Sequence, residues 1–119
     1  MAELHESTLV SFRKKFLKKG FQEKKSPMPD YRPDVFAQRV SKRGAVKDEI
    51  IAEAEIESTL FKDHTSEQLA KMEKYLDHRK RDHVIVKAYL VVPTGKRIGA
   101  LAQSLLDSLT TKKIRVVQL

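Results

Sequence analysis

The chain has 119 residues, and its 24 Lys and Arg against 16 Asp and Glu give it a formal net charge of +8. It contains no cysteine, which excludes disulfides and thiolate zinc sites, and no apolar run approaches the roughly 18 residues of a membrane span. The length predicts one domain over residues 1–119, and the absence of a signal-peptide apolar segment favours a cytoplasmic location. The basic excess indicates a polyanionic partner, with nucleic acid favoured over an anionic membrane or mere solubility.

Residues 7–21 are predicted to form a helix, because their apolar residues recur at helical spacing. Ser7 or Thr8 can cap its start, and Gly20 can close its end. The polar face of this helix is basic and carries Arg13, Lys14, Lys15, Lys18 and Lys19. Such a face is either solvated or a contact surface for phosphates, and the helix alone favours the solvated interpretation.

A hairpin is predicted to follow the helix. Three prolines make the segment before it irregular, with room for a short strand near 21–25. Residues 34–40 resemble a strand, 41–48 a hairpin loop around Gly44, and 49–57 the returning strand. The even positions of the returning strand are apolar, and its odd positions are acidic from Glu53 onward, which is the period of two that strands show.

The second half of the chain alternates helices with strands. Residues 65–82 predict a helix that opens on a Thr65–Gln68 capping box. A strand over 83–93, a helix over 96–109 and a strand over 113–119 are predicted next. The predicted order is therefore α-β-β-β-α-β-α-β, an α/β fold in which helices flank a mixed sheet.

Three glutamates at every second position, Glu53, Glu55 and Glu57, are the most unusual feature of this sequence. On one face of a strand such side chains lie about 7 Å apart, so they repel one another unless a cation intervenes. If the hairpin register brings Asp34 beside Glu55, two carboxylates converge, which is the oxygen ligand set that Mg²⁺ prefers. The alternative is an amphipathic strand with a solvated acidic face.

The segments that carry these acids also resemble a known family. "KSPMPDYRPDVFAQR", a basic loop, "IIAEAEIEST" and a helix with Gln68 resemble the PD-(D/E)xK nuclease superfamily, most closely archaeal-type Holliday-junction resolvases. In that family a PD dipeptide begins one strand, and an acidic residue, any residue and a lysine follow on the next. Pro33-Asp34 matches the first motif, and Glu55-Ile56-Glu57 matches the second, with Glu57 where lysine usually stands.

The resemblance implies a restriction-endonuclease-like fold and a metal-dependent DNA endonuclease. Asp34 and Glu55 would bind Mg²⁺ or Mn²⁺, with the carbonyl of Ile56 as a third ligand. Glu57 would orient or deprotonate the attacking water in place of lysine, and Gln68 would steady the site.

Other residues extend this interpretation. A second frame takes Glu53 and Glu55 as the acidic pair; Glu55 and Glu57 are preferred because Ser-Thr follows them, as in the family. Glu6 is the candidate for the glutamate that an N-terminal helix of resolvases brings to the metal. His64, just beyond the acidic strand, could contact a phosphate or transfer a proton.

The predicted partner is DNA, and a homodimer is expected because symmetric cleavage takes two sites. The residues predicted to hold the DNA backbone are Arg13, Lys14, Lys18, Lys96 and Arg97. The apolar residues offered for a dimer interface, Leu106 in particular, are Ile98, Leu101, Leu105, Leu106, Leu109, Val117 and Leu119. The alternatives are a catalytically inactive nucleic-acid-binding module on the same fold and, more distantly, a structural subunit.

Overall fold

The computed structural model of the protein describes residues 2–109 and 113–119. Its elements in chain order are α1 (Ala2–Phe16), β1 (Phe21–Glu23), β2 (Val35–Val40), β3 (Val46–Ala54), α2 (Asp63–Arg81), β4 (Ile85–Val92), α3 (Lys96–Ser108) and β5 (Ile114–Gln118). This order confirms the predicted α-β-β-β-α-β-α-β succession. The strands form one five-stranded mixed sheet in the order β1-β2-β3-β4-β5, antiparallel from β1 to β3 and parallel from β3 to β5.

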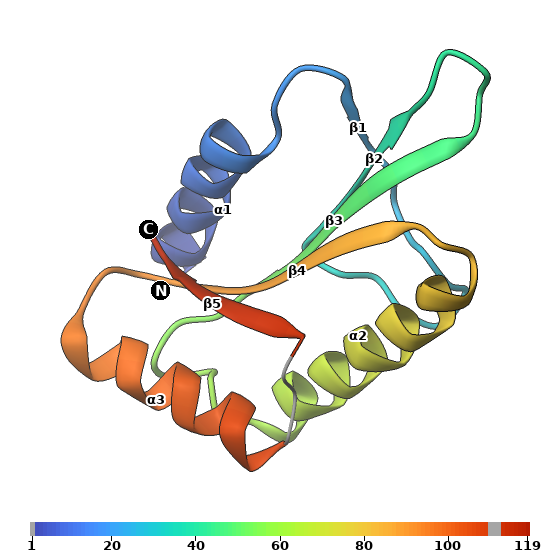
Figure 1. The fold of residues 1–119 in the computed structure, drawn as a ribbon. Coiled ribbons are helices and arrows are strands. Elements are labelled where there is room, and N and C mark those ends of the chain that lie inside the picture. The colour runs from blue at the N-terminus through green and yellow to red at the C-terminus, as the bar shows by residue number, and fades with distance from the viewer. Residues whose placement is uncertain (1, 110–112) are drawn as a thin grey trace.

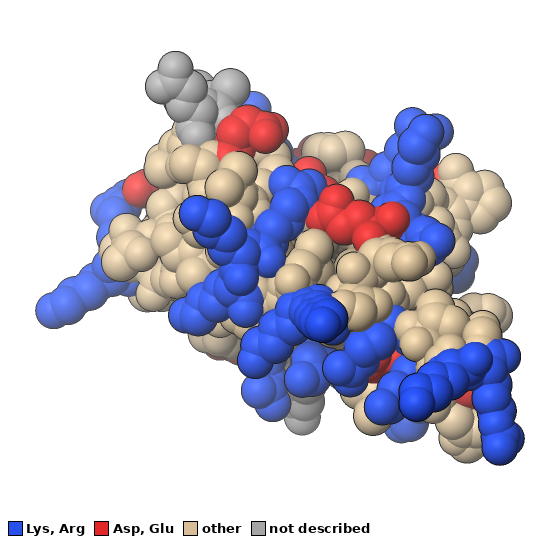
Figure 2. Space-filling view, turned by 90° about the horizontal axis from the view of Figure 1, so that it is seen from above, with Lys and Arg blue, Asp and Glu red and all other residues tan. Residues whose placement is uncertain are grey.

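Helices cover both faces of the sheet, with α1 on one face and α2 and α3 on the other (Figure 1). β3 lies at the centre and is buried on both faces, because Ile51 packs under α2 and α3 while Ile50 and Ala52 pack under α1. Seen from the α1 side, Lys and Arg side chains spread over the molecule (Figure 2). None of the described helices combines the length and apolarity needed to cross a membrane.

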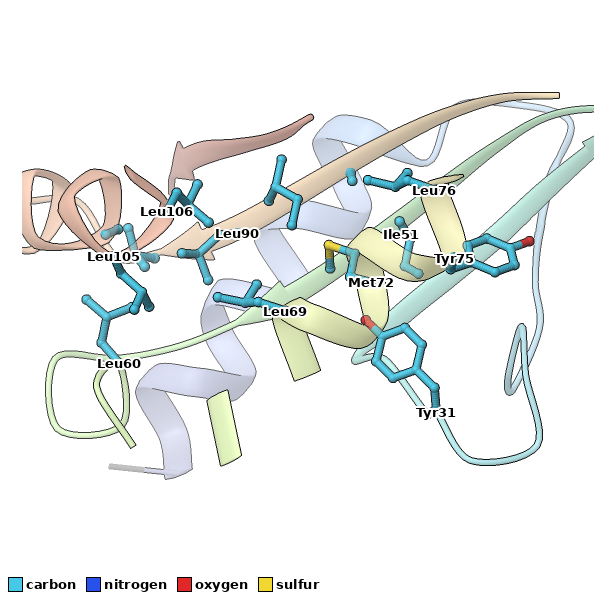
Figure 3. Close-up of a cluster of buried hydrophobic side chains, with 14 of the residues drawn as sticks. Tyr31, Ile51, Leu60, Leu69, Met72, Tyr75, Leu76, Leu90, Leu105 and Leu106 are labelled. Carbon is cyan, nitrogen blue, oxygen red and sulfur yellow. The ribbon is translucent and has the colours of Figure 1, made fainter. Parts of the chain in front are cut away.

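The larger core lies between the sheet and the pair α2 and α3 (Figure 3). Leu69 and Met72 of α2 meet Leu90 of β4 and Leu106 of α3, and all four are fully buried. The prediction that Leu106 in particular is available for a dimer interface is therefore wrong, whereas the homodimer itself stays a prediction. Burial accounts for Ile98, Leu105 and Leu106, and Leu101, Leu109 and Leu119 are partly buried against the two cores.

Both predicted helix caps are also wrong, because each helix begins before its expected cap. α1 begins at Ala2, and the Thr8 hydroxyl donates a hydrogen bond back to the carbonyl of Leu4 at 2.7 Å. α2 begins at Asp63, and the Thr65 hydroxyl instead donates to the carbonyl of Thr59 at 2.8 Å. Thr65 thereby ties the helix to the turn that precedes it.

A buried glutamate links α2 to the centre of the sheet. The Glu49 carboxylate of β3 is fully buried and accepts hydrogen bonds from Tyr75 Oη at 2.6 Å, Arg79 Nε at 2.9 Å and Gln38 Nε2 at 2.6 Å. These donors offset the cost of burying the charge of Glu49. The carboxylate therefore connects β3 with β2 and α2.

We predict that Leu106→Ala lowers the free energy of unfolding by about 2–5 kcal/mol, because it opens a cavity in the core. The matched control is Ile85→Ala, at a strand position that is 65% exposed, where we expect a loss below about 1 kcal/mol. Urea denaturation of both variants measures the difference. A Leu106→Ala variant that is as stable as the control, with a change in oligomeric state, would restore the dimer interpretation.

Candidate active site

A pocket of about 570 Å³ lies where the C-terminal end of β3 meets the N-terminal parts of α1 and α2. Apart from Ile56, its lining residues are of polar or charged types, and they combine carboxylates with cations and imidazoles. The lining residues are His5, Glu6, Arg32, Asp34, Glu53, Glu55, Ile56, Ser58, Thr59, Lys62, His64, Thr65 and Gln68. Segments far apart in the sequence therefore contribute to one site.

Asp34 lies directly before β2, and the hairpin register sets its position. β2 and β3 are antiparallel with Val35 opposite Ala52, so continuing the register by one residue puts Asp34 opposite Glu53. The backbone N–H of Ala54 donates a hydrogen bond to Asp34 Oδ2 at 2.8 Å, and His5 Nε2 lies 3.5 Å from the same oxygen. The residue opposite Asp34 is thus Glu53, two residues before the expected Glu55.

Glu53 is the most buried acid of the pocket, at 4% exposure. Its Oε1 accepts a hydrogen bond of 3.3 Å from the hydroxyl of Tyr31. Burial, followed by the negative charges of Asp34 and Glu55, raises the pKa of Glu53 to about 9. In the absence of a cation this carboxyl is therefore protonated at neutral pH.

Glu55 follows the last residue of β3 and also faces the pocket. Its backbone N–H donates to the carbonyl of Val91 at 2.9 Å, and its Oε2 accepts a hydrogen bond of 2.5 Å from the Thr59 hydroxyl. Burial raises the pKa of Glu55, the hydroxyl of Thr59 opposes that rise, and the charge of Asp34 adds to it. Glu55 is thus held in place while its charge is destabilised.

Glu57 does not line the pocket. β3 ends at Ala54 and the chain enters a turn, so the period of two on which the prediction rested stops before Glu57. The side chain is exposed, and its Oε1 accepts a hydrogen bond of 2.6 Å from Arg97 Nε. The pair that faces the pocket is therefore Glu53 and Glu55, the frame that the sequence analysis ranked second.

The carbonyl of Ile56 is also engaged elsewhere. It accepts backbone hydrogen bonds from Thr59 at 3.1 Å and from Leu60 at 3.0 Å, and so closes the turn after β3. This use argues against the predicted role of the Ile56 carbonyl as a metal ligand.

Gln68, His64 and Glu6 line the pocket, as their candidate roles require. Sequence reasoning missed the two cations on its rim, Arg32 and Lys62. The position of Arg32 directly before Pro33-Asp34 was an available signal, whereas Lys62 is recognisable only once the turn before α2 is known.

None of the five predicted DNA-binding residues lines the pocket, although the guanidinium of Arg13 donates a hydrogen bond of 3.4 Å to the carbonyl of Asp34. Arg13 forms an ion pair with Glu23 at 2.6 Å, and Arg97 pairs with Glu57. Lys14 and Lys18 are exposed at and just beyond the C-terminal end of α1, and Lys96 is exposed at the start of α3. A role for these residues in DNA binding remains a prediction.

The donor atoms of the pocket fit a hard divalent cation such as Mg²⁺ or Mn²⁺, because Asp34, Glu53 and Glu55 offer carboxylate oxygens. Each hydrogen bond described above engages one oxygen of its carboxylate. Over residues 2–109 and 113–119, no group of three or more His, Asp or Glu side chains is placed so that it could hold a metal ion. Mg²⁺ is usually held by one or two protein carboxylates with water completing its shell, and Asp34 and Glu53 could supply two.

Comparison of the chain with protein-family models, with curated proteins and with solved structures gave no match. The resemblance to PD-(D/E)xK nucleases accordingly rests on the short motifs and on the order of the elements.

We predict that Glu53→Gln stabilises the metal-free protein increasingly as the pH rises from 5 to 8.5. The folded state keeps a proton on Glu53 that the unfolded state has lost above its ordinary pKa of 4.5, so wild-type stability falls over this range. Each pKa unit of the shift is worth about 1.4 kcal/mol. The measurement is urea denaturation in chelator at several pH values.

The control for this prediction is Glu57→Gln, which changes the same chemical group on the exposed turn. Its stability difference from wild type should stay small and nearly constant with pH, because an exposed ion pair contributes little. A constant difference for Glu53→Gln as well would mean that Glu53 titrates normally and that the carboxylates are not strongly coupled.

Proposed function

We propose that this protein is a divalent-metal-dependent DNA endonuclease on a restriction-endonuclease-like fold. The observation that carries the proposal is the convergence of Asp34, Glu53 and Glu55 in one polar pocket at the end of the central strand. The order of elements and the position of Pro33-Asp34 before the hairpin agree with the family that the sequence resembles. The net charge of +8 suits a nucleic-acid substrate.

Asp34 and Glu53 are the residues that would hold the cation, since the hairpin register sets them opposite each other. When bound, Mg²⁺ or Mn²⁺ supplies positive charge that polarises the phosphodiester and acidifies the attacking water. Burial is the main cause of the raised pKa of Glu53, and the cation would offset the repulsion by Asp34 and Glu55 that adds to it. The charge arrangement therefore favours cation binding and proton loss together.

Glu55 and Gln68 are proposed to position the attacking water. Glu55 stands in the frame where the family has lysine, and its carboxylate faces the pocket, where it can accept a proton from the water. Gln68, from the second turn of α2, can donate to or accept from the same water.

Lys62 and Arg32 would supply the positive charge that the motif lysine supplies in the family, since this chain has a glutamate at that position. Both are exposed and line the pocket, so their side chains can reach a phosphate that lies over the carboxylates. Positive groups aimed at the phosphoryl oxygens stabilise the charge that develops during cleavage. His64 on the same rim can donate a proton to the leaving oxygen.

One pocket cuts one strand, so symmetric cleavage of a junction would require two copies of the chain. Such copies would pair through a surface other than α3, whose large apolar side chains mostly face the core. The alternative is a single-domain, cytoplasmic enzyme that acts as a monomer and nicks one strand, and one pocket per chain suits this alternative equally well.

The second candidate is a nucleic-acid-binding module that has lost catalysis. It is favoured by one observation, namely that a glutamate replaces the usual strand lysine and leaves the pocket rich in acids. Incubation with linear, supercoiled, single-stranded and branched DNA, with Mn²⁺ or chelator, separates the two: the module binds DNA and cuts none of these substrates.

We predict that Asp34→Asn and Glu53→Gln each abolish Mn²⁺-dependent cleavage and leave DNA binding in chelator intact. The loss should exceed the about 10–100-fold that follows removal of a supporting contact at a metal site. Glu57→Gln is the matched control and should cleave within a few-fold of wild type, because its side chain lies outside the pocket.

Cleavage that survives in Asp34→Asn and Glu53→Gln would refute the assignment of these carboxylates. Cleavage lost in Glu57→Gln but retained in Glu53→Gln would return the site to the frame that the sequence analysis preferred.

A further inference from the structure

α1 covers only part of its face of the sheet. Leu9 and Phe12 pack over the region where β3 and β4 end, against Ala52 and Val91 among others. The face continues past α1 along the first half of β4 and onto β5, where Lys87 and Arg115 are exposed. Figure 2 looks onto this side of the molecule and shows Lys and Arg gathered there.

This open part of the face is hollowed. Two hollows of about 410 Å³ and 460 Å³ both have Lys87 and Tyr89 in their linings, and the surface that they occupy extends from the end of α1 to β5. We call it the sheet groove. Its cationic lining residues are Lys15, Lys18, Arg39, Lys87, Lys113 and Arg115.

Most of this positive charge is not neutralised within the protein. Arg39 is held by Asp48, with hydrogen bonds of 2.9 Å and 2.6 Å, and Lys113 pairs with Asp77. The remaining four cations, Lys15, Lys18, Lys87 and Arg115, form no ion pair with any residue that the structure describes. Glu49 also borders the groove, but its carboxylate is buried against Arg79.

Aromatic rings alternate with these cations. Tyr89 is half-buried in the wall, where its ring centroid lies 4.9 Å from that of Phe16 and 5.6 Å from that of Phe12. Phe21 lies further along the groove under the guanidinium of Arg39, at 5.3 Å. A rigid aromatic surface between uncompensated cations is the combination on which unpaired bases stack while phosphates are neutralised.

We propose that the sheet groove binds single-stranded nucleic acid, with phosphates on Lys15, Lys18, Lys87 and Arg115 and a base against Tyr89. The groove lies at the opposite end of α1 from the carboxylate pocket. α1 has 15 residues, so the two sites are separated by roughly 20 Å. Binding here does not depend on cleavage, and in an active nuclease the groove would hold an unpaired strand that flanks the cut.

The first test is fluorescence anisotropy of a labelled oligothymidylate in chelator. The double variant Lys87→Glu/Arg115→Glu should bind at least about 10-fold more weakly, and its salt slope should fall by about 1.4, the value for two lost single-strand phosphate contacts. The control Lys74→Glu/Lys80→Glu makes the same change of charge on α2, which covers the other face, and should bind within a few-fold of wild type.

The second test uses intrinsic fluorescence, because the chain has no Trp and three Tyr. Tyr31 and Tyr75 are 0% and 4% exposed, so quenching by unlabelled oligothymidylate should come from Tyr89. Tyr89→Phe should keep the affinity and lose the quenching, since phenylalanine still stacks.

Equal weakening in the two charge variants would mean diffuse attraction and would overturn the proposal, as would quenching that persists in Tyr89→Phe. Duplex DNA bound as tightly as the single strand, without quenching, would also overturn it. Because both tests run in chelator, a protein that binds in the groove and never cuts DNA refutes only the proposed nuclease function.

Discussion

The hydrogen bond of 2.8 Å from the Ala54 backbone N–H to Asp34 Oδ2 fixes the Asp34 carboxylate against the end of the central strand. It holds Asp34 against the last residues of β3, so that Glu53 and Glu55 open into the same pocket. Because β3 is buried on both faces, Glu53 is 4% exposed and lies where water screens its charge least. The turn that precedes α2, His5 of α1 and the two cations Arg32 and Lys62 lie around these carboxylates.

Two buried glutamates on the same face of β3 differ in the partners that surround them. Glu49 and Glu53 are both buried, yet Glu49 is matched by Arg79, Tyr75 and Gln38. Glu53 has the hydroxyl of Tyr31 and two neighbouring acids, and no ion pair among the described residues involves it. The fold thus pairs one buried acid with a cation and places the other beside two further acids, which is why the proposed cation site is assigned to Glu53.

The order of the elements could be predicted from the sequence because hydrophobic periodicity records which segments are helices and strands. The frame of the acidic motif could not, because alternation continues to Glu57 in sequence while the strand ends at Ala54. The same limit explains Leu106, which lies at the edge of the helical stripe yet is fully buried because β4 and α2 close over it. That Lys62 lines the pocket could not be predicted, because its position depends on the path of the turn before α2, which no periodic pattern indicates.

Titration calorimetry of Mn²⁺ binding at pH 7.5, repeated in buffers of different ionisation enthalpy, tests the carboxylate centre most directly. Since the pKa of Glu53 is raised to about 9, the account predicts that wild type binds Mn²⁺ and releases about one proton per cation. Glu53→Gln should lose that proton release. Failure of the wild type to bind Mn²⁺, or binding with no proton released, would refute the assignment of Glu53 to a cation site.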